Sequence, residues 1–280
     1  MEVPTRDALQ FSGPESEQIV DYLPPLPLSP VRRLPSDKPF VTLTFATSLD
    51  SQLAIAPGVQ TALSGPQSKA MTHFLRSRHD AILVGVGTAI ADNPSLNCRI
   101  EGVGGYGGEG LDGQPRPVVV DPHGRWEYSE ENKVIRLAKE GKGKAPYIMT
   151  CVEPSDSKRA VLESVGGEVI LLGPTAEDFN TVYSTWHVIL DALLRRGIGS
   201  VMIEGGGFVI NNILGRDLAY NLVDSVIVTI APTWLGKGGV QVCPDGGSKQ
   251  LPVRRLKDTK WIPLGEDVVL CGRPNKELRQ

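Results

Sequence analysis

The sequence has few cysteines, and none of them stands in a metal-binding pattern. Its four cysteines lie far apart among 280 residues, and no C-x-x-C pair occurs. This spacing argues against a zinc site and against a disulfide framework, and it is typical of proteins from reducing compartments. The four histidines show no metal-ligand spacing either, so we expect no metal. We interpret His79, at the end of a predicted helix, as a surface residue.

An excess of positive charge and long hydrophobic runs are also missing. The chain has 29 basic and 32 acidic residues and no run rich in lysine and arginine, so we expect no nucleic-acid partner. No apolar run approaches the roughly 20 residues that span a bilayer. The first ten residues contain acids and no apolar core, which argues against a secretory signal. We therefore expect a cytoplasmic protein without a membrane partner, although the sequence does not separate cytosol from nucleus.

The first 38 residues differ from the rest and form a proline-rich extension. Residues 23–30 carry four prolines, which remove hydrogen-bond donors and exclude regular helix or central strand. This segment is either a polyproline II ligand for a partner or an extension along the protein surface, and we favour the extension. Residues 16–23 have the pattern of a short helix. Residues 39–280 are predicted to form one further domain.

Strand and helix patterns alternate through most of that domain. The strands are continuous apolar runs, which favours an α/β fold with a mostly parallel mixed sheet and helices on both faces. The predicted strands are 40–46, 81–84, 117–121, 146–150, 169–172, 200–203, 223–231 and 267–271, and the predicted helices are 67–78, 133–139, 183–196 and 208–214. Residues 101–115 are very rich in glycine. Because no strand precedes them and no helix follows, we favour a flexible insertion over a phosphate cradle.

Two glycine junctions follow predicted strands directly. One is 85–88 (Gly-Val-Gly-Thr) and the other is 204–207 (Glu-Gly-Gly-Gly). Glycine lets a backbone turn sharply and approach a ligand, and the helix after it points free N–H groups at an anion. Neither junction matches G-x-G-x-x-G or a P-loop, and each one alone could be a plain tight turn. Together, at one sheet edge, they favour a nucleotide site.

The loop 91–99 after the first junction places Asp92 and Arg99 around a proline turn. A guanidinium suits a phosphate, and Arg76 in the preceding helix adds charge nearby. Alternatively, the polar groups of this loop could bond to one another and not to a ligand. Asp92 would then cap the turn and pair with Arg99. No G-x-S-x-G elbow and no activated cysteine is present, so an enzyme with this sequence would depend on a cofactor.

The ordered motifs resemble those of the riboflavin-pathway pyrimidine reductases. They lie at residues 45–50, 75–76, 80–88, 91–99, 116–121, 204–206, 222–224, 231–232 and 235–236. The resemblance covers about residues 39–272. It implies a dihydrofolate-reductase-like fold and a homodimer. It also implies NADPH-dependent reduction of the ribosyl group of a pyrimidine ribosyl phosphate to a ribityl group, through the open-chain imine of the substrate.

The resemblance also assigns residues. Positions that would contact NADPH are Ala46, Thr88, Asp92, Gly205, Gly206, Gly207, Phe208 and Val209. Positions that match substrate contacts are Arg76, Leu96, Arg99 and Glu204, and the two arginines suit a 5′-phosphate. The resemblance assigns no acid or base; from their loop positions, we take Asp50, Asp92 and Glu204 as candidates to protonate or orient the substrate. The chain departs from the family at Ser51, where glycine is common. It also lacks the zinc-deaminase signature of bacterial members, so we expect reduction without deamination.

Two alternatives stay open. The first is a dihydrofolate reductase on the same fold. The polar loop 92–99 argues against it, because a ribose phosphate needs such a loop more than a pterin does. The second is a non-catalytic nucleotide-binding scaffold that docks through the proline-rich N-terminus.

Overall fold

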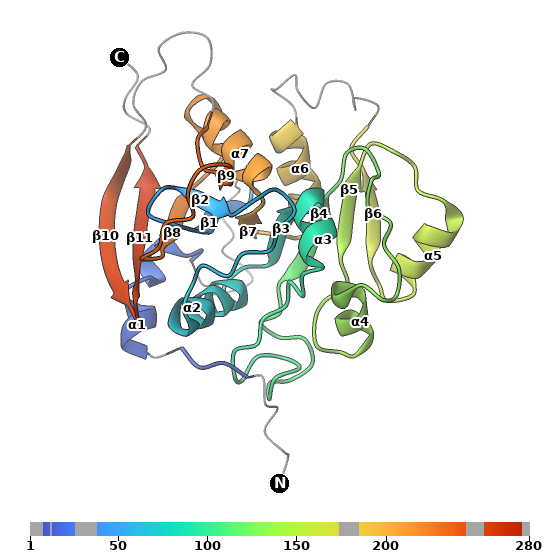
Figure 1. Cartoon of the computed structure of the whole chain (residues 1–280). Helices are drawn as coiled ribbons and strands as arrows, with labels where there is room; N and C mark the ends of the chain where they lie inside the picture. Colours follow the sequence, from blue (N-terminus) through green and yellow to red (C-terminus); the bar gives the residue numbers. More distant parts are fainter. Residues whose placement is uncertain (1–7, 12, 26–37, 174–184, 245–254, 276–280) are drawn as a thin grey trace.

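The computed structural model describes residues 8–11, 13–25, 38–173, 185–244 and 255–275. Nine strands of these residues form one sheet (Figure 1). In spatial order they are β10 (Leu256–Leu264), β11 (Asp267–Pro274), β8 (Ser225–Ile230), β1 (Phe40–Thr47), β7 (Ser200–Gly205), β3 (Ala81–Gly85), β4 (Arg116–Val120), β5 (Tyr147–Thr150) and β6 (Glu168–Leu171). Neighbours from β8 to β6 pair in parallel, whereas β11 and β10 add an antiparallel edge. A small ribbon joins β2 (Gln52–Ala54) to β9 (Val240–Gln241).

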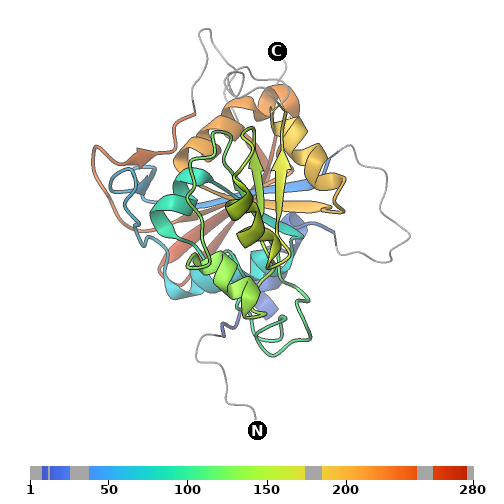
Figure 2. The ribbon, with the colours of Figure 1, turned by 90° about the vertical axis from the view of Figure 1, so that its right-hand side faces the viewer.

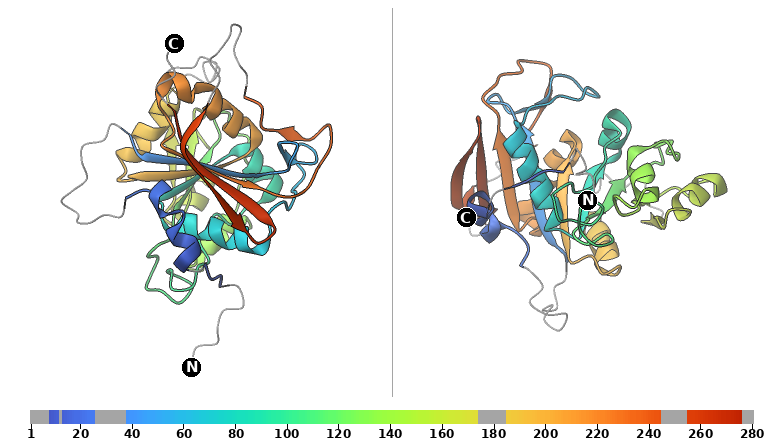
Figure 3. Two further views of the ribbon diagram at one scale, coloured as in Figure 1. Left: turned by 90° about the vertical axis from the view of Figure 1, so that its left-hand side faces the viewer. Right: turned by 90° about the horizontal axis from the view of Figure 1, so that it is seen from below.

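Helices cover both faces of the sheet (Figures 2 and 3). One face carries α6 (Thr185–Leu194) and α7 (Gly207–Tyr220), and the other carries α2 (Pro66–Ser77), α3 (Val86–Asp92), α4 (Lys133–Lys139) and α5 (Asp156–Glu163). Successive strand residues point to opposite faces. Leu83 therefore packs into the core under α6 and α7, while Ile82 and Val84 pack under α3 and α4. This confirms the predicted α/β fold with a mostly parallel sheet and helices on both faces.

Some elements were not predicted, and their composition explains why. The edge strand β10 carries Lys257, Asp258, Lys260 and Pro263, and most of its residues are exposed. Charge and proline at a sheet edge discourage pairing with other chains, and they also remove the apolar pattern of a strand. The helix α5 buries only Leu162, so it lacks a periodic apolar face. The helix α7 extends to Tyr220, six residues beyond its predicted end.

The described part of the N-terminal extension packs onto the domain. This part forms two short helices, α1 (Gly13–Glu17) and η1 (Val20–Tyr22). Ile19, Tyr22 and Leu23 are buried there in a hydrophobic cluster that includes Met71 and Val269. Upstream, the amide of Leu9 donates to the carbonyl of Arg99 (2.8 Å). The segment 13–25 therefore contributes core contacts. Most of the predicted proline-rich stretch lies outside the described residues.

The glycine-rich segment 101–115, which we predicted as a flexible insertion, forms a compact set of turns. Asn97 donates to the hydroxyl of Tyr106 (2.9 Å), and Gln114 donates to the carbonyls of Cys98 (2.7 Å) and Gly104 (2.8 Å). A Cβ on Gly104 or Gly108 would lie 2.6 or 2.2 Å from backbone atoms of the same segment. Glycine is needed here because the turns pack backbone against backbone, a requirement that composition alone does not reveal.

His79 is not the surface residue that we predicted, since only 4% of it is exposed. Its Nδ1 lies 2.7 Å from the carbonyl of Leu75, an acceptor, so Nδ1 carries the proton. Its Nε2 then accepts from the hydroxyl of Thr42 (2.7 Å). Burial lowers the pKa of His79 to about 4. The neutral ring is therefore a structural link between the end of α2 and β1.

We expect His79 to make stability pH-dependent. The unfolded chain binds a proton near pH 6.5, whereas folded His79 does so only near pH 4, because burial lowers its pKa. Stability is thus complete above about pH 6.5 and falls toward pH 4 by about 1.4 kcal/mol per pH unit for one proton. Urea unfolding of wild type and His79→Gln at several pH values tests this. The stability advantage of the wild type should shrink as the pH falls, and a constant difference would contradict it.

Candidate active site

A cavity of about 1670 Å³ opens at the carboxyl ends of the parallel strands. Its lining comes from β1, α2, the segments after β3 and β4, and the junction between β7 and α7. Ligands of open α/β sheets bind at this edge, because the strand-to-loop turns leave backbone groups and side chains free to face them. The sequence-predicted residues that line the cavity are Ala46, Arg76, Thr88, Asp92, Arg99, Glu204, Gly205, Gly206, Gly207, Phe208 and Val209.

The two glycine junctions meet at this edge. β3 and β7 are neighbours, and Val84 pairs with Gly205. The amide of Gly206 donates to Oγ1 of Thr88 (3.0 Å), which joins the junctions directly. A Cβ on Gly206 would lie 2.8 Å from that oxygen, and one on Gly85 would lie 2.8 Å from Cγ2 of Val209. Glycine therefore permits the close approach of the two turns.

The helix α7 begins at Gly207, immediately after this contact. The amide of Ile210 donates to the carbonyl of Gly206 (3.0 Å), as expected for the first turn of a helix. The amides before it have no partner within the helix, and they carry the positive end of the helix dipole. The junction can therefore hold an anionic group such as a pyrophosphate.

Glu204 reaches the cavity because of a β-bulge. Leu83 pairs with Ile203 and Val84 pairs with Gly205, so Glu204 is the extra residue of β7. A bulge re-aims the side chain that it carries. Both carboxylate oxygens of Glu204 accept from Nη2 of Arg76, at 2.8 and 2.7 Å, and Nη1 of Arg76 donates to the carbonyl of Asn97 (3.0 Å).

This ion pair is partly enclosed, with 12% of the Arg76 side chain and 23% of the Glu204 side chain exposed. Nε of Arg76 is buried without a partner among the described residues. The pair therefore holds Arg76 in place without using its full hydrogen-bonding capacity within the described residues. The cavity thus presents a carboxylate and a guanidinium side by side at the end of β7.

Asp92 ends α3 and also lines the cavity. Burial raises the pKa of its carboxyl group, an effect that the nearby charge of Lys133 opposes. A carboxyl group with a raised pKa can hold a proton closer to neutral pH than an exposed one. Asp92 is therefore able to give a proton to a bound molecule.

Two of the predicted site residues do not line the cavity. Asp50 accepts from the hydroxyl of Ser48 and from the amides of Leu235 (3.1 Å) and Gly236 (2.7 Å). These hydrogen bonds lower the pKa of Asp50, so the carboxylate ties two loops together and is poorly suited to donate a proton. The side chain of Leu96 is 2% exposed and packs in the core under α3 and α4.

Other residues in the cavity wall were not predicted as site residues. The helix α2 presents Lys69, Thr72 and His73 beside Arg76, and the β4–α4 region presents His123, Arg125, Lys133 and Arg136. The spacing of Lys69, His73 and Arg76 by four and three residues was a usable signal, because such residues share one helix face. The second group comes from a loop and a helix that only the tertiary fold brings to the cavity.

The contacts at the glycines predict opposite effects for two alanine substitutions. Gly206→Ala places Cβ against the oxygen of Thr88 and should destabilise the protein by about 1–3 kcal/mol. Gly87→Ala is the matched control, since Gly87 lies in α3 and a Cβ there meets no atom within 4 Å. Alanine is a better helix former, so this control should be stabilising by about 0.5–1 kcal/mol. Equal unfolding free energies for the two variants would contradict the close packing of the junctions.

Comparisons with known proteins agree with this architecture. A family model described as RibD C-terminal domain matches residues 39–270. The 2,5-diamino-6-ribosylamino-4(3H)-pyrimidinone 5′-phosphate reductase of Debaryomyces hansenii is 40% identical over 259 residues, covering 89% of this chain and 98% of that protein. The reductase of the same name from Saccharomyces cerevisiae is 37% identical over 236 residues, covering 84% of this chain and 86% of that protein.

Solved structures show the same fold. The Saccharomyces cerevisiae riboflavin biosynthesis reductase Rib7 matches with a TM-score of 0.70 and 32% identity, covering 92% of this chain and 98% of that one. Acinetobacter baumannii RibD matches with a TM-score of 0.61 and 23% identity, covering 86% of this chain and 59% of that one. The predicted resemblance is therefore confirmed. Because the family model spans most of its length, this chain belongs to the RibD C-terminal domain family of riboflavin biosynthesis reductases.

Proposed function

We propose that this chain reduces the ribosyl side chain of 2,5-diamino-6-ribosylamino-4(3H)-pyrimidinone 5′-phosphate to the ribitylamino form, with NADPH as reductant. The observation that carries the proposal is that the joined glycine junctions and the Arg76–Glu204 pair line the same cavity. A nucleotide site and a site for a polar, anionic substrate must adjoin for hydride transfer. Relatives that match nearly their whole length to this chain carry the name of this reductase.

The residues of the junctions suit a dinucleotide. A Cβ on Gly206 would lie 2.8 Å from Oγ1 of Thr88 and one on Gly207 would lie 2.3 Å from Cγ1 of Val240, so glycine keeps this turn tight. The first turn of α7 then offers its amides to a pyrophosphate. Thr88 and Asp92 follow the neighbouring strand and line the same wall. NADPH, when bound, would supply the hydride. The protein's part is to place the nicotinamide against the substrate and to keep water from the reacting carbon.

A second set of basic residues favours NADPH over NADH. His123 and Arg125 follow β4, and Lys133 and Arg136 lie on α4, all in the cavity wall. They come from other elements than Lys69, Arg76 and Arg99, which we assign to the substrate side (Figure 1). Two groups of cations in one cavity suit two phosphates, the 2′-phosphate of the cofactor and the 5′-phosphate of the substrate.

Protonation of the substrate falls to the cavity carboxyl groups. Reduction adds a hydride to the carbon of the open-chain imine and a proton to its nitrogen. Asp92 is the better donor, because burial raises the pKa of its carboxyl group. Glu204, held as the partner of Arg76, orients the polar substrate. Asp50 is no longer a candidate for this role, since its carboxylate is bonded to the loop at Leu235 and Gly236.

Nothing in the cavity favours the other two functions over this one. The many cations around it exceed what a pterin requires. The N-terminal segment 13–25 packs into the core, while most of the proline-rich stretch through which a scaffold would dock lies outside the described residues. Among the described residues, no helix is long and apolar enough to cross a membrane. The homodimer and the cytoplasmic location stay predictions.

The proposed reaction is tested by NADPH consumption with the diaminopyrimidinone ribosyl phosphate. Asp92→Asn and Glu204→Gln should each lower kcat/KM by about 10²- to 10⁴-fold, the range for general acid–base and charge-assisted roles. Glu168→Gln is a matched control, because Glu168 pairs with Arg196 on the surface far along the sheet, at β6. No turnover by folded wild type would refute the proposal, and full activity of both variants would refute the residue roles.

The cofactor preference is tested at Arg125, which is exposed in the cavity wall. Arg125→Ala removes a charge-assisted contact to a 2′-phosphate, so we expect KM for NADPH to rise about 10-fold while KM for NADH stays nearly constant. Arg159→Ala is the control, because Arg159 pairs with Glu153 at α5, away from the cavity lining. Equal changes for both cofactors would show that Arg125 does not contact the 2′-phosphate.

A further inference from the structure

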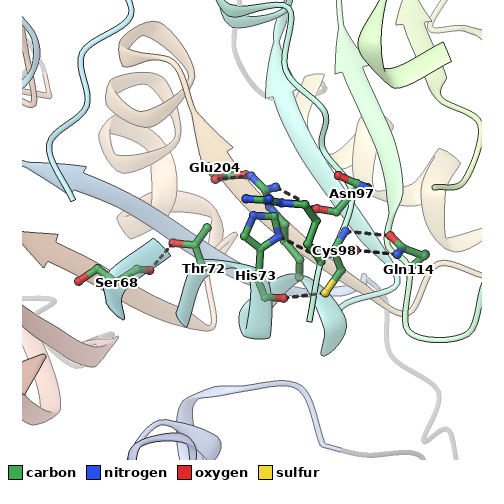
Figure 4. Close-up of polar contacts among 9 residues, drawn as sticks. Ser68, Thr72, His73, Asn97, Cys98, Gln114 and Glu204 are labelled. Carbon is green, nitrogen blue, oxygen red and sulfur yellow. Dashed lines mark hydrogen bonds and ion pairs between the residues drawn. The ribbon is translucent and has the colours of Figure 1, made fainter. Parts of the chain in front are cut away.

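His73 is a buried polar residue at the floor of the cavity that no part of the proposed mechanism yet uses. It lies on α2, with 5% of its surface exposed, and it lines the cavity between Lys69 and Arg76. Figure 4 shows it on α2 below Glu204, between Thr72 and Cys98. A buried histidine in a binding cavity needs an account of both ring nitrogens, because each must be either a donor or an acceptor.

Nδ1 of His73 is an acceptor. The backbone amide of Arg99 donates to it at 3.1 Å, so a proton cannot also sit on Nδ1. The carbonyl of His73 accepts from Sγ of Cys98 (3.0 Å), which holds the same loop from the other side. The neutral ring must then carry its proton on Nε2. Tertiary contacts to the 97–99 loop thus select one tautomer.

The ring stays neutral because of its surroundings. Burial lowers the pKa of His73 to about 2, helped by the charges of Arg76, Arg99 and Lys69 and opposed by the Asn97 carbonyl. Within the described residues, the ring interacts with the Arg99 amide and with the Asn97 backbone, whose carbonyl also accepts from Arg76. Nε2–H is the donor of the neutral ring, and the ring lines the cavity.

We propose that His73 is a neutral hydrogen-bond donor to the phosphate monoester of the substrate, with its Nε2–H oriented by the backbone amide of Arg99. Lys69 and Arg76 lie one turn before and after it on α2, and Arg99 lies across the Nδ1 contact. A phosphate dianion suits two uncompensated cations, a third that Glu204 pairs, and one neutral donor. The neutral donor adds a contact without a charge on the buried ring, which burial would penalise. This inference rests on the proposed function.

Two substitutions separate this role from a structural one. Gln places an amide near the position of Nε2, whereas Asn places one near Nδ1. If Nε2–H binds the phosphate, His73→Asn should raise KM for the substrate roughly 10- to 100-fold, the range for a hydrogen bond to a charged group. For His73→Gln, KM for the substrate should stay within about 3-fold of the wild-type value. KM for NADPH should change little in both, which distinguishes the substrate phosphate from the 2′-phosphate of the cofactor.

The opposite order of the two variants would overturn the proposal, because it would mean that only the Nδ1 contact to Arg99 matters. Equal losses in both variants, or a larger change in KM for NADPH, would overturn it as well. Thermal unfolding of both variants checks that they fold.

A measurement on wild type keeps the inference separate from the proposed reaction. Nitrogen-15 NMR of the His73 ring should show the Nε2–H tautomer, and added inorganic phosphate should shift its signals. An Nδ1–H tautomer, or no response to phosphate, would overturn the role of His73. If phosphate binds but the pyrimidine substrate is not turned over, the proposed function fails while the phosphate contact stands.

Discussion

The hydrogen bond from the amide of Gly206 to Thr88 joins the two halves of the cavity wall. It forms because β3 and β7, which are far apart in the chain, pair in parallel and end at the same level. Both turns must be free of Cβ atoms for this approach, since a side chain on Gly85 or Gly206 would collide with the opposite junction. The start of α7 lies directly after that contact, and the β-bulge just before it directs Glu204 into the cavity.

Charge is distributed around this backbone framework in two groups. Lys69, Arg76 and Arg99 surround His73 on one side, and the residues from the β4 loop and α4 form the other group. Glu204 neutralises Arg76 where the chain buries it, which avoids an isolated enclosed cation. A substrate phosphate would therefore meet cations that the fold already holds in position. Such preorganisation reduces the entropy lost on binding.

Much of this arrangement was predictable from local patterns. The continuous apolar runs predicted the central strands, because a strand buried on both faces has no polar alternation. The glycine junctions were recognisable because such turns require glycine, here for the positive φ of Gly205 and for the close packing at Gly206 and Gly207. The ordered motifs then predicted the family, and the comparisons confirm it. By contrast, β10 and α5 were missed, since exposed elements carry little apolar periodicity.

The sequence by itself determined the α/β class, the two glycine junctions and the identity of Arg76, Arg99 and Glu204 as chemically capable residues. It could not decide which of them meet, because contacts between distant strands and loops are set by sheet order and register. Only the tertiary structure pairs Arg76 with Glu204, withdraws Asp50 into a loop contact and buries His79. It also fixes the tautomer of His73, since the amide that selects it comes from a loop 26 residues away.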